Sequence, residues 1–320
     1  MKAREWTLAA LLALLMLYAW RADPSFVSLR AQALLSTHIW ELAIVAIPML
    51  LIVIAAGIDL SVGSMFALCA VVLGLLHERG VPIGWAAIAA MAAGALQGAI
   101  NGWFVARLKV HPLLVTLGTM AAYRGIAEGI STARPLSGYP EGFLALSHEN
   151  LLGVPIPGWV FLCLAMFAAL VLGRTVFGKW TIALGTNESA TRFSAIPVAR
   201  VQWLLFAGCG LACGIAAVLT VARTNTAKAD MGMGLPLEAV TAVVLGGAKI
   251  EGGSGSVIGL VLGLALIHET REFVSWHWKL NELNLIVLGA LLIVSVLIQR
   301  VFESRNRVAS RPAWGGNEAF

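Results

Sequence analysis

The sequence predicts an all-α polytopic membrane protein, with about ten helices in two similar halves and both termini in the cytoplasm. Three observations support this fold class. Hydrophobic residues make up 59% of the 320 residues and charged residues only 12%, against about 45–50% and about 25% in an average soluble domain. Apolar runs close to membrane length recur between short polar breaks. The 33 glycines suit membrane helices, which pack closely through small residues.

The apolar runs define the expected helices in chain order. Crossing a bilayer takes about 20 residues, and several of the runs reach or approach that length. The run at 236–247 is short, and the glycine-rich segment 246–256 joins it to the following run, so the two form either a hairpin of short helices or a re-entrant pair. We expect helices at about 6–20, 39–56, 62–77, 83–106, 112–130, 158–173, 201–222, 236–247, 255–270 and 283–299.

The first run follows Lys2 and Arg4, as in a signal peptide, but it ends in Tyr18–Arg21 without a small-residue cleavage site. We therefore expect a retained first helix. Lysine and arginine are enriched in cytoplasmic loops, and a cytoplasmic N-terminus places most of them inside. The expected segments are a transmembrane domain 1–300 with an external loop 131–157 and a cytoplasmic loop 174–200, then a polar tail 301–320.

Two glycine-rich connections, 55–64 and 245–256, are similar to each other. Each has a glycine turn, an acidic residue and then a Gly-Ser pair that opens the next helix. Because transporters are often built from internal repeats, we expect the two connections at related positions of the two halves. The residues expected to shape and gate them are Asp59, Ser61, Gly63, Gly246, Gly247, Gly252 and Gly253.

Polar side chains inside apolar runs are costly in lipid and mark either helix contacts or function. Asp59 lies at a bilayer edge, where it either caps the next helix or takes part in gating. Arg124 and Glu128 are four residues apart, so they either pair along one helix face or line the external mouth. Three further polar residues either hydrogen-bond helices together or, with Arg124, line a pathway through them: Gln97, Asn101 and Thr116.

The sequence lacks the motifs of several enzyme classes. It contains no phosphate-binding Gly-x-x-x-x-Gly-Lys-Ser/Thr loop, no His-Glu-x-x-His and no nucleophile elbow. Cys209 and Cys213 share a helix face, but two sulfurs alone make a poor metal site. No basic stripe interleaved with aromatics indicates nucleic-acid binding. We expect no catalytic residue, metal or cofactor in this chain, so energy for uphill movement of a solute must come from a partner.

The basic cytoplasmic loop offers a place for such a partner. Asn187 or Thr186 can cap a short helix that runs to Phe193, and Pro197 prevents its continuation. This helix would present Phe193 and Ile196 as an apolar knob. The residues alone leave two interpretations open, a docking element for a partner and an ordinary loop helix on lipid headgroups.

Five stretches occur in the order known from one transporter family and cover roughly 40–300: 57–64, 98–102, 111–119, 187–192 and 242–256. Together they resemble the permease subunits of ribose-type ABC importers for monosaccharides. Residues 194–198 and 246–248 are similar to the autoinducer-2 permeases, and 268–278 to the rhamnose permeases. Lys249 and Glu251 depart from the turn of the ribose permeases, so the resemblance does not name the solute.

The resemblance implies a multi-pass protein of the bacterial inner membrane, surrounded by lipid, that works with several partners. They are an ABC ATPase that uses ATP and Mg, a periplasmic sugar-binding protein, and a second permease chain, identical or paralogous. It also implies that 188–196 is the coupling helix that seats in the ATPase. The residues expected to carry this coupling are Asn187, Glu188, Ala190, Thr191, Arg192, Phe193 and Ile196.

The expected function is import of a monosaccharide or a similar small polyol, powered by the partner. Two other classes remain as alternatives. A secondary transporter driven by an ion gradient needs ionisable residues at mid-membrane, whereas the acidic residues here cluster at helix ends. An intramembrane enzyme needs a nucleophile or a metal cluster, and the sequence shows no motif for either.

Overall fold

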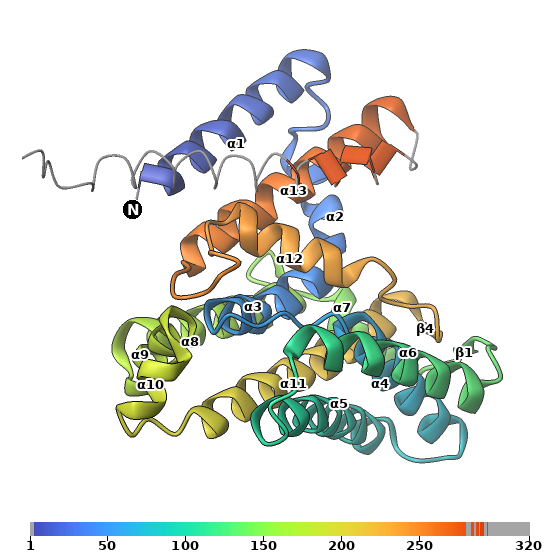
Figure 1. The fold of residues 1–320 in the computed structure, drawn as a ribbon. Helices are drawn as coiled ribbons and strands as arrows, with labels where there is room; N and C mark the ends of the chain where they lie inside the picture. The colour runs from blue at the N-terminus through green and yellow to red at the C-terminus, as the bar shows by residue number, and fades with distance from the viewer. Residues whose placement is uncertain (1–2, 280–282, 285, 288, 291–292, 294–320) are drawn as a thin grey trace, which may run out of the picture.

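The computed structural model describes residues 3–279, together with 283–284, 286–287, 289–290 and 293, and this part is almost entirely helical (Figure 1). The helices are α1 (Ala3–Ala22), α2 (Leu29–Leu35), the 3-10 turn η1 (Ser36–His38), α3 (Trp40–Ile54), α4 (Val62–Glu78), α5 (Ile83–Ala106), α6 (Pro112–Ser131), α7 (Glu141–His148), α8 (Ile156–Arg174), α9 (Val176–Thr186), α10 (Glu188–Phe193), α11 (Val198–Thr224), α12 (Leu235–Leu245) and α13 (Val257–Trp278). Short antiparallel strand pairs join β1 (Leu136–Ser137) to β4 (Thr226–Ala227) and β2 (Asn150–Leu151) to β3 (Val154–Pro155).

The helices follow the predicted order, with differences at their ends. α2, η1, α7 and α9 lie outside the predicted helix ranges. The helix predicted at 255–270 runs on to Trp278, because the charged residues that made its end look polar are paired: Arg271 with Glu238 and Glu272 with His38. The predicted helix 283–299 lies largely outside the described residues, and the predicted tail 301–320 lies wholly outside them.

The short run predicted at 236–247 is α12, which has 11 residues. At about 1.5 Å per residue it covers only about half of a bilayer core of about 30 Å. The chain then turns through 246–256 into α13, which packs against α12. α12 is therefore too short to cross a membrane by itself.

The most closely packed pair of helices is α5 and α11, which lie side by side in the lower part of Figure 1. Gly94 of α5 meets Gly210 of α11 backbone to backbone, and a Cβ at Gly98 would collide with the carbonyl of Phe206. Gly94, Gly98 and Gly102, spaced by four residues, therefore form a packing surface on α5. α3 lies against α11 and is buried over almost its whole length, which makes it part of the core.

Four described helices are long and apolar enough to cross a membrane by length and composition: α1, α5, α8 and α11. A fifth candidate joins Leu29–His38 to Trp40–Ile54 across a bend of 58°. α4 and α12 are apolar but shorter. These findings fit a helical membrane protein, whereas ten crossings and the position of both termini stay predictions.

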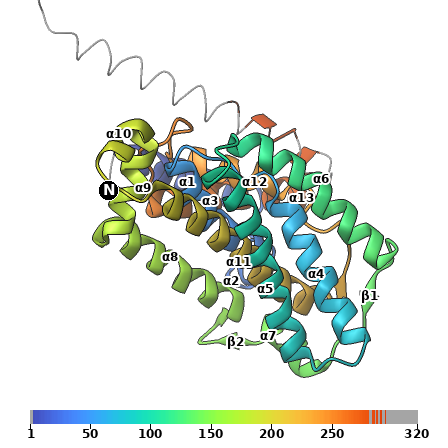
Figure 2. The ribbon, with the colours of Figure 1, turned by 60° about the horizontal axis from the view of Figure 1, so that its bottom comes forward.

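The candidate functional residues lie at two opposite ends of the bundle (Figure 2). α10 lies at one end, with the connections that follow α3 and α12. α7 and the strands β1, β2 and β3, which all fall within 131–157, lie at the other end, where β4 pairs with β1. We refer to these as the α10 end and the α7 end.

Candidate functional site

Three connections that are far apart in sequence meet at the α10 end. The Gly253 amide donates to the carbonyl of Ile54, at 2.8 Å, and so joins the turn after α12 to the end of α3. The end of α9 fills the space beside them, because a Cβ at Gly185 would collide with that same carbonyl and lie 2.5 Å from the Gly253 nitrogen. The two similar connections predicted from sequence therefore touch each other, and α9 touches both.

Glycine is required at this junction for conformation and for space. Gly252 and Gly253 have φ angles of +90° and +78°, which L residues rarely adopt. A Cβ at Gly252 would also approach the Gly185 carbonyl to 2.8 Å and the Ala56 Cβ to 2.7 Å. These contacts are made mainly between backbone atoms, without long side chains between them. α9 therefore packs directly against the turns that follow α3 and α12.

α10 follows α9 immediately and forms as the sequence predicted. The Asn187 side chain caps it by accepting from the Ala190 amide at 2.9 Å, and the helix ends at Phe193. Arg192 donates from Nε to Glu188 at 3.0 Å, which supports the helix across one turn. Phe193 is 93% exposed, so the end of α10 presents an uncovered aromatic ring.

Two of the predicted coupling residues, Thr191 and Ile196, are less exposed than a docking surface requires. Thr191 is buried, and its hydroxyl donates at 2.7 Å to the carbonyl of Asn187, the N-cap residue of the same helix, so Thr191 offers no surface to a partner. Ile196 is only partly exposed, beyond the end of the helix. Phe193 is therefore the more exposed of the two residues predicted to form the knob. Glu188, Ala190 and Arg192 are exposed as expected.

A buried hydrogen-bond network holds the connection between α3 and α4. Asp59 Oδ1 accepts from the backbone amide of Ser61 at 2.9 Å and from its hydroxyl at 2.6 Å. Asn101 of α5 donates to the Ser61 hydroxyl at 2.8 Å, and Tyr123 of α6 donates to Asn101 at 3.2 Å. Asp59 thus binds the residue before α4 and not an amide of its first turn. The network ties the connection to α5 and α6.

The residues predicted as pathway candidates all make hydrogen bonds inside the bundle. Thr116 donates to the Ile58 carbonyl at 3.3 Å, and Gln97 donates to the Ala93 carbonyl at 3.0 Å. Arg124 donates to backbone carbonyls of the 225–234 loop and of Gly63. A Cβ at Gly63 would collide with the Gly232 carbonyl, so this loop lies directly on α4. A pathway role for these residues stays a prediction.

The N-terminus of α1 secures the second connection, which the sequence reasoning missed. Arg4 donates to the Val244 carbonyl at 2.8 Å, and Glu5 accepts from the Ser256 hydroxyl at 2.6 Å. Val244 lies in the last turn of α12, and Ser256 caps α13. A cation near a helix C-terminus and an anion near a helix N-terminus both interact favourably with the helix dipole. Arg4 and Glu5 of α1 therefore stabilise the end of α12 and the start of α13, on either side of the turn that joins them.

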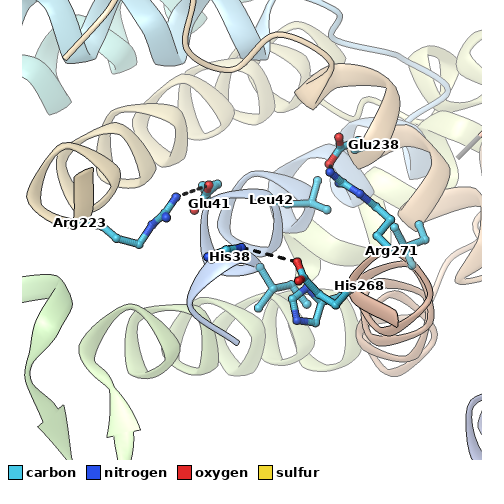
Figure 3. Close-up of a pocket in the computed structure, with 10 residues that line it drawn as sticks. His38, Glu41, Leu42, Arg223, Glu238, His268 and Arg271 are labelled. Carbon is cyan, nitrogen blue, oxygen red and sulfur yellow. Dashed lines mark hydrogen bonds and ion pairs between the residues drawn. The ribbon is translucent and has the colours of Figure 1, made fainter. Parts of the chain in front are cut away.

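A charged cavity of about 250 Å³ lies at the α7 end (Figure 3). Arg223 of α11 pairs with Glu41 of α3 at 2.8 Å. Arg271 of α13 pairs with Glu238 of α12 at 2.5 Å. The cavity is lined by His38, Ile39, Glu41, Leu42, Arg223, Glu238, Ile267, His268, Arg271 and Glu272.

A second space of about 310 Å³ adjoins the cavity and shares part of its lining, including Glu41, Arg223 and Arg271. The sequence reasoning missed this site because its charges were assigned to loops or to helix ends. One signal was available: His268, Glu269, Arg271 and Glu272 fall within five positions of one apolar helix. Such residues are costly in a membrane and usually face a cavity or a partner.

Residues 33–296 match a family described as "Branched-chain amino acid transport system / permease component". The "Autoinducer 2 import system permease protein LsrD" of Yersinia enterocolitica is 37% identical over 273 residues, 83% of this chain and 82% of the relative. The proteins of that name from Yersinia pseudotuberculosis and Photorhabdus luminescens are each 34% identical, over 95% and 92% of this chain and 93% and 90% of the relatives. No solved structure is significantly similar to the chain.

Proposed function

The chain belongs to the permease-component family of branched-chain amino acid transport systems, and from this premise we propose that it imports a small polyhydroxylated solute on energy from a separate ABC ATPase. The family match and the relatives confirm the resemblance to importer permeases. Their names specify autoinducer 2 import, which favours the autoinducer-2 branch over the rhamnose branch.

The observation that carries the proposal is the junction at the α10 end. An importer permease without its own ATPase needs an exposed element that a partner can move and a rigid connection from it to the transport helices. α10 provides the exposed element, with Phe193 and the Glu188–Arg192 pair on its surface. The glycine contacts of Gly185 and Gly252 provide the rigid connection.

The helices that meet in the junction also reach the cavity. α3 and α12 each begin at the cavity, with Glu41 and Glu238, and end at the junction. α13 begins at the junction and carries Arg271 at the cavity. A displacement of α10 would move the junction ends of α3, α12 and α13. Because each helix is rigid, the part of it that lines the cavity would move as well. An ATPase that binds α10 differently before and after ATP hydrolysis could in this way favour one state of the cavity.

In the assembly that we propose, the α10 end faces the cytoplasm and the α7 end faces the periplasm. The ATPase, with ATP and Mg, docks on α10, and a sugar-binding protein docks on the α7 end. A second permease chain, identical or paralogous, completes the translocation unit in the inner membrane. The exposed leucine and tryptophan side chains of α1, α5 and α8 suit contact with lipid or with that second chain.

Uptake of autoinducer 2 into proteoliposomes that contain this chain, its ATPase and its binding protein tests the proposal. We expect accumulation that requires ATP and is abolished by Phe193→Ala or Arg192→Glu with membrane insertion unchanged. Leu114→Ala is the control, because Leu114 is 65% exposed on α6, outside α10 and outside the α7 end. Accumulation driven by an ion gradient without ATP would instead show a secondary transporter, and wild-type uptake in both α10 variants would refute the coupling role.

A further inference from the structure

We propose that the charged cavity at the α7 end is a binding subsite for a neutral, polyhydroxylated solute. The solute would lie among α3, α11, α12 and α13, with its hydroxyl groups on the two arginine–glutamate pairs. This inference rests on the proposed import function for the direction of transfer. It deepens that function by assigning the solute class to named residues.

The first argument is the cost of the charges. The side chains of Arg223 and Glu41 are each 24% exposed, and those of Arg271 and Glu238 are 33% and 18% exposed. Burying an ion pair carries a desolvation penalty that apolar residues of similar volume would avoid. Within an apolar helix bundle, retained charges that line a cavity indicate contact with water or a polar solute.

The second argument is the chemistry of the lining. A hydroxyl group is both a hydrogen-bond donor and an acceptor. An arginine–glutamate pair presents N–H donors and carboxylate acceptors side by side, so one hydroxyl can donate to the carboxylate and accept from the guanidinium. The pairs of Arg223 with Glu41 and of Arg271 with Glu238 both line the cavity (Figure 3). A solute with adjacent hydroxyls can therefore engage several charged groups at once.

The third argument is the balance of charge. Three carboxylates, two guanidinium groups and two imidazoles line the cavity, and His38 Nδ1 lies 3.6 Å from Glu272. Because each arginine already has a carboxylate partner, an anionic solute must displace one of these carboxylates. A neutral solute adds hydrogen bonds without displacing any. The adjoining space adds the hydroxyls of Thr220 and Thr224.

One polar atom of the lining also lacks a partner. His268 Nε2 is buried and makes no hydrogen bond within the described residues. A buried imidazole nitrogen without a partner is costly, and a solute hydroxyl that reaches His268 Nε2 would remove this cost. Phe66 at the wall of the adjoining space offers an apolar face to the carbon side of the same solute. The two spaces together thus present the mixed lining of a small-molecule site.

Protection of an introduced cysteine tests the subsite on the purified chain. Leu42→Cys places a thiol where both spaces meet, and Cys163→Ser removes the exposed native thiol. We expect autoinducer 2, D-ribose or L-rhamnose to slow labelling by a small thiol reagent at least threefold, whereas ribose 5-phosphate and L-leucine leave it unchanged. Protection by none of the three neutral solutes, or by L-leucine alone, overturns the inference.

A charge swap separates solute binding from a structural role of the pairs. Glu238→Arg with Arg271→Glu rebuilds an ion pair with its polarity reversed. We expect wild-type insertion and thermal stability, unchanged stimulation of ATP hydrolysis by the loaded binding protein, and at least a tenfold loss of uptake when that protein is saturating.

Wild-type uptake by the cavity swap would show that the pairs only hold helices together, and would overturn the inference. The two tests also separate this inference from the proposed function. If the wild-type complex shows no uptake that depends on ATP, the proposed function fails, and the thiol protection measured on the chain alone still decides the subsite.

Discussion

Gly185→Ala tests the contact between α9 and the two connections. The new methyl group would overlap the Ile54 carbonyl oxygen and lie 2.5 Å from the Gly253 nitrogen. Overpacking of this kind costs about 1–3 kcal/mol, and loss of the Gly253 to Ile54 hydrogen bond adds about 1 kcal/mol. Alanine is favoured over glycine within a helix by about 1 kcal/mol, so the net destabilisation should be about 1–3 kcal/mol.

Thermal unfolding of the purified chain in detergent measures this change. For a chain of this size, about 1–3 kcal/mol corresponds to a Tm that is lower by about 2–6 °C. Gly208→Ala is the matched control, because nothing lies within 4 Å of a Cβ at that position of α11, and its Tm should stay equal or rise. In the complex, Gly185→Ala should lose uptake while the ATPase stays bound. Equal stability and equal uptake of the two variants would refute the close contact.

Three further predictions follow from individual hydrogen bonds. Tyr123→Phe removes the hydroxyl that joins α6 to the buried network and should cost about 1 kcal/mol in thermal unfolding; an unchanged Tm would contradict the network. Arg4→Ala removes a charged bond to the end of α12 and should cost about 1.5–3 kcal/mol, partly restored by Arg4→Lys; equal losses in both variants would argue against a role for charge. Hydrogen bonds from Ser25 and, to a smaller extent, from Trp276 hold the pKa of Asp23 below its usual 3.8. The stability that these bonds contribute is therefore complete above pH 3.8, and it is lost as the pH falls through the lowered pKa. The Trp276 indole NMR resonance should therefore keep its position from pH 7 to 4, and a transition above pH 4 would contradict the bond.

The parts of the fold that depend on local sequence could be predicted. Apolar run length placed α5 at its observed range, and the cap at Asn187 with the stop at Pro197 placed α10. The abundance of glycine predicted close helix packing, which α5 and α11 show at Gly94 and Gly210. Each of these features is set by neighbours in the chain, through periodicity, capping or side-chain size.

The features that depend on distant partners could not be predicted. The end of α13 was placed too early, since the residues that neutralise Arg271 and Glu272 belong to α12 and η1. The cavity was missed for the same reason: its charges come from five separate elements. The partners of Arg4 and Glu5 lie about 240 and 251 residues further along the chain. Sequence spacing within one helix carries no information about such contacts.

The sidedness of α10 tests the central claim most directly. Arg192→Cys and Leu152→Cys, each with Cys163→Ser, place single exposed thiols at the α10 end and the α7 end. We predict that a membrane-impermeant thiol reagent applied to cells with a permeabilised outer membrane labels Leu152→Cys, and that it reaches Arg192→Cys only in inverted inner-membrane vesicles. Labelling of Arg192→Cys from the periplasmic side would place α10 out of reach of a cytoplasmic ATPase and contradict the account.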